Sequence, residues 1–362
     1  MVEIRRIRYA LVGAGNIAQV AVLPAFAHAT ENSELVAIVS SDEEKRRALA
    51  ERYGVEHTGT YEDFERTLEI SRADAVYIAV PNHLHREYTE RAAKMGVHVL
   101  CEKPMATSSE DCQAMIDATH EAGVRLMIAY RLHFEAANLR AIDLVRSGRI
   151  GNPLLLSSTL THWVPTGDIR TRPDVGGGAL FDIGTYCINA ARYLFGDEPH
   201  EVFCFANVGR GAGAGVDETV VGILRFPGGR YAEFSISQMA APVSFFRVIG
   251  SQGVLETEGA FSYTDPRTQT LTFDGERGEV NFPPVDQFAP ELVYFSRCIL
   301  EETEPEPSGV EGLADVRIIE ALQRSFRRGE PVSLEPFPFP CYPTPAPRID
   351  KPPVEPPPTV NA

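Results

Sequence analysis

Lys103 lies shortly after an apolar stretch of the chain and is flanked by Glu102 and Pro104. The apolar residues 97–100 predict a buried strand, because they are almost uninterrupted by polar side chains. In parallel α/β sheets, ligands bind beyond the carboxyl ends of the strands. An ammonium group at this position would therefore polarise a substrate oxygen beside a nicotinamide ring.

A proton-transferring partner for this lysine is predicted in residues 179–195, whose pattern is that of an amphipathic helix. One face is apolar, and Asp182, Tyr186, Asn189 and Tyr193 form a narrow stripe on the other. A solvated polar face is the alternative, but two tyrosines without lysine or glutamate favour a pocket wall. Because Asp182 and Tyr186 are four residues apart, they can act on one group. We predict that Tyr186 exchanges a substrate hydroxyl proton, while Asp182 orients the site or binds a substrate hydroxyl.

A glycine-rich turn after the first predicted strand supplies a dinucleotide site. Residues 13–18 match the pattern G-x-G-x-x-A. Gly13 and Gly15 allow a tight turn and close approach to a pyrophosphate, and Asn16 and Ile17 open the helix whose N-terminus favours negative charge. An ordinary strand–helix turn is the alternative, but the strand–turn–helix context favours the dinucleotide site.

The end of the second predicted strand bears on the choice between NADP and NAD. Sites specific for NAD usually place an acidic residue there for the ribose 2′-hydroxyl. This chain instead has Ser40 and Ser41, followed by Lys45 and Arg46. Hydroxyl groups and cations suit a 2′-phosphate, so we predict NADP. In the alternative, Asp42 binds the ribose of NAD and Lys45 is solvated.

The loop after a third apolar strand is predicted to face the same cofactor. It contains Val80, Pro81, Asn82, His83 and His85. The two histidines have no third ligand at suitable spacing, so we predict no metal. We expect the loop to bind near the nicotinamide ribose, with the imidazoles as local braces.

The segments around these motifs alternate between strand and helix up to residue 131. Predicted strands are residues 9–12, 35–39, 75–80, 97–100 and 126–129, and predicted helices are residues 16–28, 43–53, 83–95 and 109–122. Alternation at this spacing predicts α/β structure, with an N-terminal Rossmann domain built on a doubly wound parallel sheet.

The pattern changes after about residue 150. Predicted strands at residues 153–162, 200–208, 218–226, 230–237 and 244–249 follow one another, with later helices at residues 290–302 and 311–328. Such a run predicts an α+β domain with a large, open, mostly antiparallel sheet. We therefore divide the chain into a dinucleotide-binding domain (1–131), a substrate-binding and oligomerisation domain (132–332) and a proline-rich tail (333–362).

The composition excludes several classes of protein. The chain has 362 residues, 44% of them hydrophobic, and a formal net charge of −16. This charge argues against nucleic acid or an anionic membrane as partner. We see no export signal after Arg5 and Arg6, no stretch apolar enough for a membrane span, and no regular spacing among the six cysteines. A cytoplasmic location is expected.

The motifs together resemble those of the Gfo/Idh/MocA family of NAD(P)-dependent sugar oxidoreductases, and in particular its glucose–fructose oxidoreductase and aldose dehydrogenase branch. Besides the glycine turn, the matching segments are residues 79–85 (AVPNHLH), 101–104 (CEKP), 129–133 (AYRLH), 176–186 (GGGALFDIGTY), 190–196 (AARYLFG) and 312–321 (GLADVRIIEA).

The resemblance implies that Lys103, Asp182 and Tyr186 form the catalytic set. Many members carry histidine in place of Tyr186, and the tyrosine is similar to that of the aldose, xylose and dihydrodiol branch. Glu102 is expected at the cofactor and Arg131 near the nicotinamide or substrate. Lys103, Asp182 and Tyr186 would also contact the sugar.

Three functions are compatible with these residues and this resemblance. The first is an NADP-dependent oxidation of an aldose to its lactone. The second is an aldose–aldose oxidoreductase that never releases NADP, and the third is a non-catalytic dinucleotide sensor. Trp163 is a candidate sugar contact from loop 161–175, together with Arg170 and Arg172. The alternative for the two arginines is that they are solvated or contact another subunit. The partner is a small sugar, and the resemblance implies a homodimer or homotetramer formed through the open sheet.

Overall fold

The computed structural model describes residues 5–209, 215–338, 343 and 348–361. Its first part is a six-stranded parallel sheet in the order β3-β2-β1-β4-β5-β6. The strands are β1 Ile7–Val12, β2 Ser33–Val39, β3 His57–Gly59, β4 Ala75–Ile78, β5 His98–Glu102 and β6 Leu126–Ala129. The order reverses direction between β1 and β4, which creates the crevice where ligands bind in such sheets. The predicted doubly wound sheet is confirmed.

Helices on both faces bury these strands. They are α1 Leu23–Ala25, which continues a π-helical turn at Ala18–Val22, α2 Glu43–Tyr53, α3 Phe64–Ser71, α4 His85–Lys94 and α5 Ser109–Glu121. Side-chain caps begin two of them, since Asp42 accepts from the Lys45 N–H and Ser108 from the Asp111 N–H. The short elements β3 and α3 are not predicted from the sequence.

The second part is a nine-stranded sheet in the order β14-β13-β12-β11-β7-β10-β9-β8-β15. The strands are β7 Pro153–Trp163, β8 Glu201–Val208, β9 Asp217–Phe226, β10 Arg230–Ser237, β11 Met239–Gly250, β12 Gly253–Glu258, β13 Arg267–Phe273, β14 Glu276–Phe282 and β15 Val332–Ser333. Neighbouring strands are antiparallel except β7 and β10, which run parallel. The predicted mostly antiparallel sheet is confirmed.

Strands β12, β13, β14 and β15 are absent from the sequence prediction. Strand β14 is almost entirely exposed and carries several charged residues, so its own pattern is not that of a buried strand. It is held by its register with β13, in which Arg267 pairs with Phe282 and Phe273 with Glu276. Hydrogen bonding to β13, and not the burial pattern of its own side chains, therefore makes this segment a strand.

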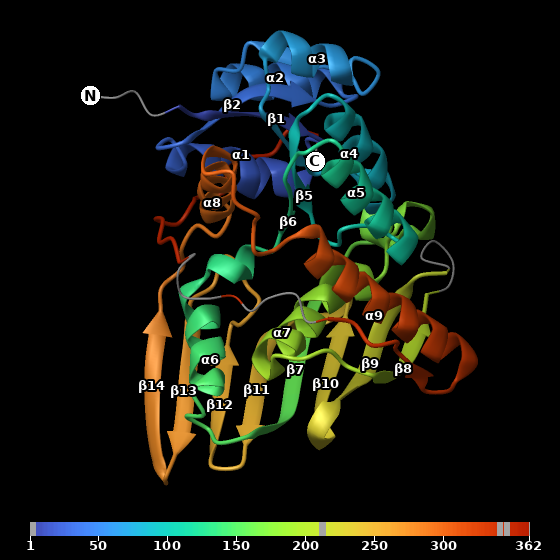
Figure 1. The fold of residues 1–362 in the computed structure, drawn as a ribbon, viewed down its shortest axis with the longest axis vertical. Helices are drawn as coiled ribbons and strands as arrows, with labels where there is room; N and C mark the ends of the chain where they lie inside the picture. Colours follow the sequence, from blue (N-terminus) through green and yellow to red (C-terminus); the bar gives the residue numbers. More distant parts are fainter. Residues whose placement is uncertain (1–4, 210–214, 339–342, 344–347, 362) are drawn as a thin grey trace.

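Helices cover one face of the second sheet (Figure 1). They are α6 Ala136–Arg146, α7 Thr185–Phe195 and α9 Gly309–Arg328. The core between helices and sheet contains apolar residues of α7 and α9 and the inward side chains of β7 to β11. Large apolar side chains remain exposed elsewhere on the sheet, and Phe205 is 71% exposed.

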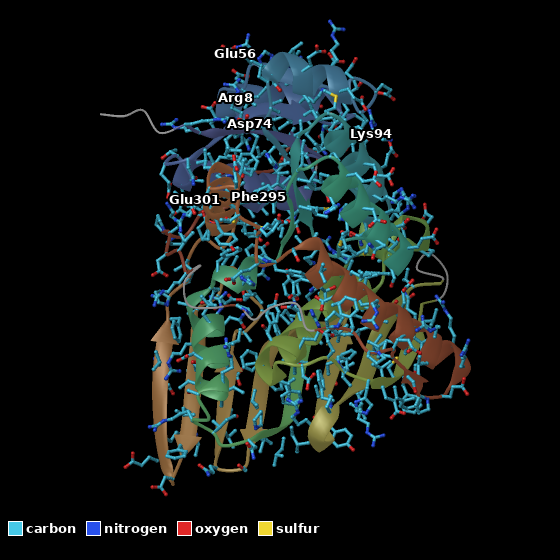
Figure 2. All side chains as sticks on the ribbon, viewed as in Figure 1. Arg8, Glu56, Asp74, Lys94, Phe295 and Glu301 are labelled. Carbon is cyan, nitrogen blue, oxygen red and sulfur yellow. The ribbon has the colours of Figure 1, made fainter. Side chains whose placement is uncertain are left out.

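Helix α8, Ala289–Leu300, returns to the first sheet although it follows the second along the chain. Its Leu292 carbonyl and its Ser296 hydroxyl hydrogen-bond to the Tyr9 hydroxyl of β1, and its Val293 carbonyl accepts from the Asn32 side chain. Phe295 lies where α8 meets the first domain (Figure 2). The two parts of the chain are therefore bound together by a shared core.

The proline-rich tail lies against the first domain. Lys351 pairs with Glu31, and the Pro358 carbonyl accepts from Arg52. The Val360 backbone makes two hydrogen bonds to the side chain of Gln19. Residues 351–360 of the tail thus contact their own chain. None of the helices described is long and apolar enough to cross a bilayer.

Candidate active site

A cavity of about 1290 Å³ lies where the carboxyl ends of the first sheet face the second domain. The residues that the sequence predicts for the cofactor and for catalysis line it, as does Trp163. These residues are Gly13, Gly15, Asn16, Ile17, Ser40, Ser41, Lys45, Val80, Pro81, Asn82, His85, Glu102, Lys103, Arg131, Trp163, Asp182 and Tyr186. The fold brings them together, and their individual roles stay predictions.

The glycine turn approaches the neighbouring strand so closely that one position excludes a side chain. Gly13 has a φ of +94°, and a Cβ there would lie 2.5 Å from the Ala79 carbonyl oxygen. A Cβ at the next glycine, Gly15, would meet no atom within 4 Å, so the backbone there faces open space. A pyrophosphate would fit against this turn.

The part of the cavity predicted to hold the adenosine has the polar groups expected for a 2′-phosphate. Ser40, Ser41, Asp42 and Lys45 all line it. Asp42 accepts the Lys45 N–H at 2.9 Å as the N-cap of α2, so one of its oxygens already serves the helix. Its other oxygen lies 3.5 Å from the Asn361 amide nitrogen.

The loop after β4 is braced by its histidine and joined to the second domain by its asparagine. The His85 ring is fully buried, with Nε2 3.0 Å from the Val80 carbonyl and Nδ1 3.0 Å from the Pro104 carbonyl. Asn82 donates to the Gly176 carbonyl at 2.8 Å. His85 thus connects the loop to the turn after Lys103, and Asn82 connects it to the glycine segment that precedes Asp182 and Tyr186.

That glycine segment is crowded on every side. A Cβ at Gly176 would lie 2.5 Å from Thr107, at Gly177 2.5 Å from the Arg170 carbonyl, and at Gly178 2.5 Å from Asp217. Asp217 in turn accepts the Leu180 N–H at 2.7 Å. Small residues are therefore needed for the cofactor loop, the loop containing Arg170 and strand β9 to meet at one point.

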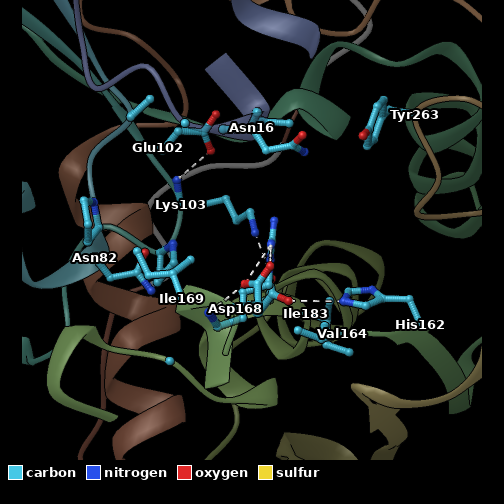
Figure 3. Close-up of a pocket in the computed structure, with 18 of the residues that line it drawn as sticks. Asn16, Asn82, Glu102, Lys103, His162, Val164, Asp168, Ile169, Ile183 and Tyr263 are labelled. Atoms are coloured by element: carbon cyan, nitrogen blue, oxygen red, sulfur yellow. Dashed lines mark hydrogen bonds and ion pairs between the residues drawn. The ribbon is translucent and has the colours of Figure 1, made fainter. Parts of the chain in front are cut away.

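Lys103 points across the cavity toward the second domain (Figure 3). Its Nζ donates to the Asp182 carbonyl at 2.8 Å and lies 4.8 Å from the centre of the Tyr186 ring. The preceding Glu102 accepts from Tyr77 at 2.8 Å, and burial raises the pKa of the Glu102 carboxyl. The lysine and tyrosine that the sequence predicts as partners are therefore neighbours.

The helix that carries Asp182 and Tyr186 starts with a π-helical turn, Leu180–Gly184, and continues as α7. Such turns often occur at functional sites. Asp182 and Tyr186 line the cavity, whereas Asn189 and Tyr193 are buried. Asn189 hydrogen-bonds to Asp315 of α9. The polar stripe is thus a pocket wall over its first half and an interhelical contact over its second.

Three side chains surround the Asp182 carboxylate. Gln238 Nε2 lies at 3.0 Å, and His162 Nε2 and Arg170 Nε each lie at 3.4 Å. Burial acts to raise the pKa of Asp182, but the His162 hydrogen bond and the charges of Lys103 and Arg170 hold that pKa well below its usual range. Asp182 is therefore an anion that can accept hydrogen bonds from a substrate.

Nothing in the sequence pattern marks His162 or Gln238 as site residues. His162 lies in β7 and Gln238 follows β10, and only the pairing of these strands brings both to Asp182. The ring of His162 points into the pocket, and a dashed line marks its approach to the carboxylate (Figure 3). No spacing along the chain could have revealed this contact.

The three candidate sugar contacts of loop 161–175 have different positions. Trp163 is 61% exposed and lines the cavity, so its aromatic face is available to a sugar. Arg170 lines the cavity as well, next to Asp182. Arg172 does not line it and pairs with Asp174 at an exposed position. Arg172 is therefore a surface residue, in keeping with the solvated alternative.

Comparison with known proteins places the chain in a family. The model of an oxidoreductase family with an NAD-binding Rossmann fold matches residues 7–130, and that of the GFO/IDH/MocA C-terminal domain matches residues 138–256. D-xylose 1-dehydrogenase [NADP(+)] of Haloarcula marismortui is 35% identical over 346 residues, which cover 91% of this chain and 93% of the relative. The 1,5-anhydro-D-fructose reductase of Ensifer adhaerens is 30% identical and covers 91% of this chain and 98% of its own.

Solved structures agree. Aldose-aldose oxidoreductase from Caulobacter crescentus, complexed with glycerol, superposes with a TM-score of 0.86 at 38% identity over 91% of this chain and 100% of its own. A 3-ketoreductase from Actinomadura kijaniata, in complex with NADP and TDP-benzene, has a TM-score of 0.81 at 28% identity, covering 89% and 98%. Motifs, fold and relatives agree, and the chain is an enzyme that belongs to the Gfo/Idh/MocA family of oxidoreductases.

Proposed function

We propose that the protein is an NADP-dependent sugar oxidoreductase that transfers hydride between C1 of an aldose and the nicotinamide, with the lactone as oxidised product. The observation that carries the proposal is the meeting of Lys103, Tyr186 and Asp182 in the cavity that the glycine turn also lines. The names of the xylose dehydrogenase and aldose-aldose oxidoreductase relatives support the substrate class.

The residues present fit NADP. The backbone at Gly13 lies so close to the Ala79 carbonyl that this turn has no room for a side chain. Ser40 and Ser41 line the same cavity as Lys45. These groups would hold the pyrophosphate and the 2′-phosphate. When bound, NADP supplies the hydride acceptor at nicotinamide C4.

The protein's own groups would handle the oxygen and its proton. Lys103 would hold the C1 oxygen by a charge-assisted hydrogen bond. As the phenolate, Tyr186 would take the hydroxyl proton while the carbon is oxidised, and as the phenol it would return that proton in the reverse direction. The anionic Asp182 would accept from a neighbouring sugar hydroxyl and, through its backbone carbonyl, keep Lys103 in place.

The test is an assay of the purified protein with D-xylose and D-glucose, following absorbance at 340 nm with added NADP or NAD. Lactone formation with a preference for NADP supports the proposal. Absence of turnover with a panel of aldoses in either direction would exclude it.

The second candidate is an aldose–aldose oxidoreductase that keeps its NADP between half-reactions. The similarity to the Caulobacter crescentus enzyme favours it. A nucleotide that survives desalting, and is reduced by one aldose and reoxidised by another, would support this candidate. Turnover that depends entirely on added NADP would support a dehydrogenase instead.

We further propose a homodimer or homotetramer that forms through the second sheet. Phe205, Val221, Ile223, Tyr231 and Val243 are exposed on its strands. Exposed apolar surface of this kind is typical of protein–protein interfaces.

A further inference from the structure

Arg131 is a buried cation in the active site whose contacts differ from those of a ligand-binding arginine. It is only 5% exposed and begins the 3-10 turn that follows β6. It belongs to the first domain but reaches residues of the second. The sequence places it near the nicotinamide or the substrate, and in the structure it lines the cavity.

Protein groups already occupy three of its nitrogens. Its Nη2 donates to the Phe261 carbonyl at 2.6 Å, its Nη1 donates to Gln287 Oε1, and its Nε donates to the Tyr186 hydroxyl oxygen at 3.2 Å. The guanidinium also lies 4.8 Å from the ring centre of Tyr186 and 5.4 Å from that of Tyr263. Protein groups therefore contact both the nitrogens and the flat face of this guanidinium. It does not present a free pair of N–H groups for bidentate binding of a phosphate.

The bond to Tyr186 restricts what the tyrosine can do. A phenol has one hydrogen to donate and lone pairs that accept. Arginine has no acceptor, so the Tyr186 hydrogen cannot point at Arg131 and is left for another oxygen. Lys103, which lies over the same ring, is likewise only a donor. The acceptor that remains for this hydrogen is therefore an oxygen in the cavity.

We infer that Arg131 is a positioning residue that acts through Tyr186: it directs the tyrosine hydroxyl at the substrate oxygen and stabilises the phenolate that forms when the proton leaves. This inference rests on the proposed function, because it requires Tyr186 to transfer the proton. A hydrogen bond from a cation favours the charged form of its acceptor. Arg131 itself need not touch substrate.

The test is a double-mutant cycle of Arg131→Met and Tyr186→Phe, measured by single-turnover hydride transfer and steady-state kinetics. Arg131→Met should lower kcat by about 10- to 100-fold, the size expected for loss of one hydrogen bond to a charged group. The KM values for sugar and NADP should stay within about twofold. Arg131→Lys, which keeps the charge, should recover part of the loss. In the Tyr186→Phe background, Arg131→Met should cause no further loss.

Two results would overturn the inference. One is an equal loss from Arg131→Met with and without the Tyr186 hydroxyl, and the other is an effect confined to KM for the sugar or NADP. Gln287→Leu provides a second variant if Arg131→Met does not fold, since it only loosens the guanidinium, and its smaller loss should likewise vanish in the Tyr186→Phe background. If Tyr186→Phe alone keeps full activity, the proposed function fails first, which separates the two outcomes.

Discussion

The ammonium group of Lys103 donates a 2.8 Å hydrogen bond to the backbone carbonyl of Asp182, although the two residues are 79 positions apart. One residue follows a strand of the first domain, and the other lies in the π-helical turn of the second. A backbone acceptor fixes the lysine without neutralising it. The positive charge therefore remains available for a substrate oxygen.

Tyr186→Phe should lower turnover by on the order of 10²-fold or more, as expected for a lost general acid–base. NADP affinity should be unchanged, because Tyr186 is in α7 of the second domain and the predicted pyrophosphate turn is in the first. Steady-state kinetics and a nucleotide titration would measure both. Tyr53→Phe, which removes a hydroxyl from α2 outside the cavity, is the control. Wild-type turnover in Tyr186→Phe would reject the proton-transfer assignment.

Lys45→Ala should raise KM for NADP and leave KM for NAD nearly unchanged, since only NADP carries the 2′-phosphate. Loss of one charge-assisted contact predicts roughly a tenfold effect. Arg47→Ala is the matched control, because it removes the same charge from the same helix at an exposed position that does not line the cavity. An equal effect on both nucleotides would contradict the phosphate role.

Asp217 makes the stability of the protein depend on pH. Burial raises the pKa of its carboxyl from 3.8 to about 6, although the Leu180 N–H bond opposes this. A raised folded-state pKa gives stability that is fully present below pH 3.8 and is lost as pH rises through about 6. The magnitude is of the order of 2–3 kcal/mol.

Asp217→Asn should therefore flatten this dependence, since an amide oxygen can still accept the Leu180 N–H and does not titrate. Thermal or denaturant unfolding of both proteins between pH 4 and 7 would measure the difference. The free energy of unfolding of the variant, relative to the wild type, should rise with pH. A constant difference across the range would refute the role of Asp217.

Ile223→Glu should dissociate the proposed oligomer, because the charge would be buried in an apolar contact at a cost of several kcal/mol. Ile223 is 44% exposed on β9. Sedimentation velocity would show a shift to a smaller species. Ile70→Glu, at an exposed position on α3 of the first domain, is the control. A wild-type species that is already monomeric would exclude the interface.

The dinucleotide half of the site could be predicted well because it is local. The turn containing Gly13 and Gly15 lies within a single strand–turn–helix unit, and its conformation follows from glycine at those positions. Parallel strand ends meet at one edge of a sheet, so Ser40, Asn82 and Lys103 could be expected at one cavity without knowing any distance.

Other features depend on contacts between distant segments. Strand β14 has no alternation of buried and exposed side chains, and it forms a strand because it pairs with β13. The second half of the polar stripe on α7 was predicted as pocket wall, but α9 covers it and Asn189 meets Asp315. His162 and Gln238 reach Asp182 from segments that only the second sheet brings together.

The alternation of strand and helix, the glycine turn and the residue types that can move a proton are all readable from the amino-acid order, because they follow from local backbone geometry and side-chain chemistry. What each side chain faces depends instead on how the two domains pack. Arg131 illustrates the difference: its charge is evident from the sequence, but its bond to Tyr186 exists because two domains close around one cavity. Contacts between residues far apart in the chain depend on how all the helices and strands pack together, so no local stretch of sequence determines them.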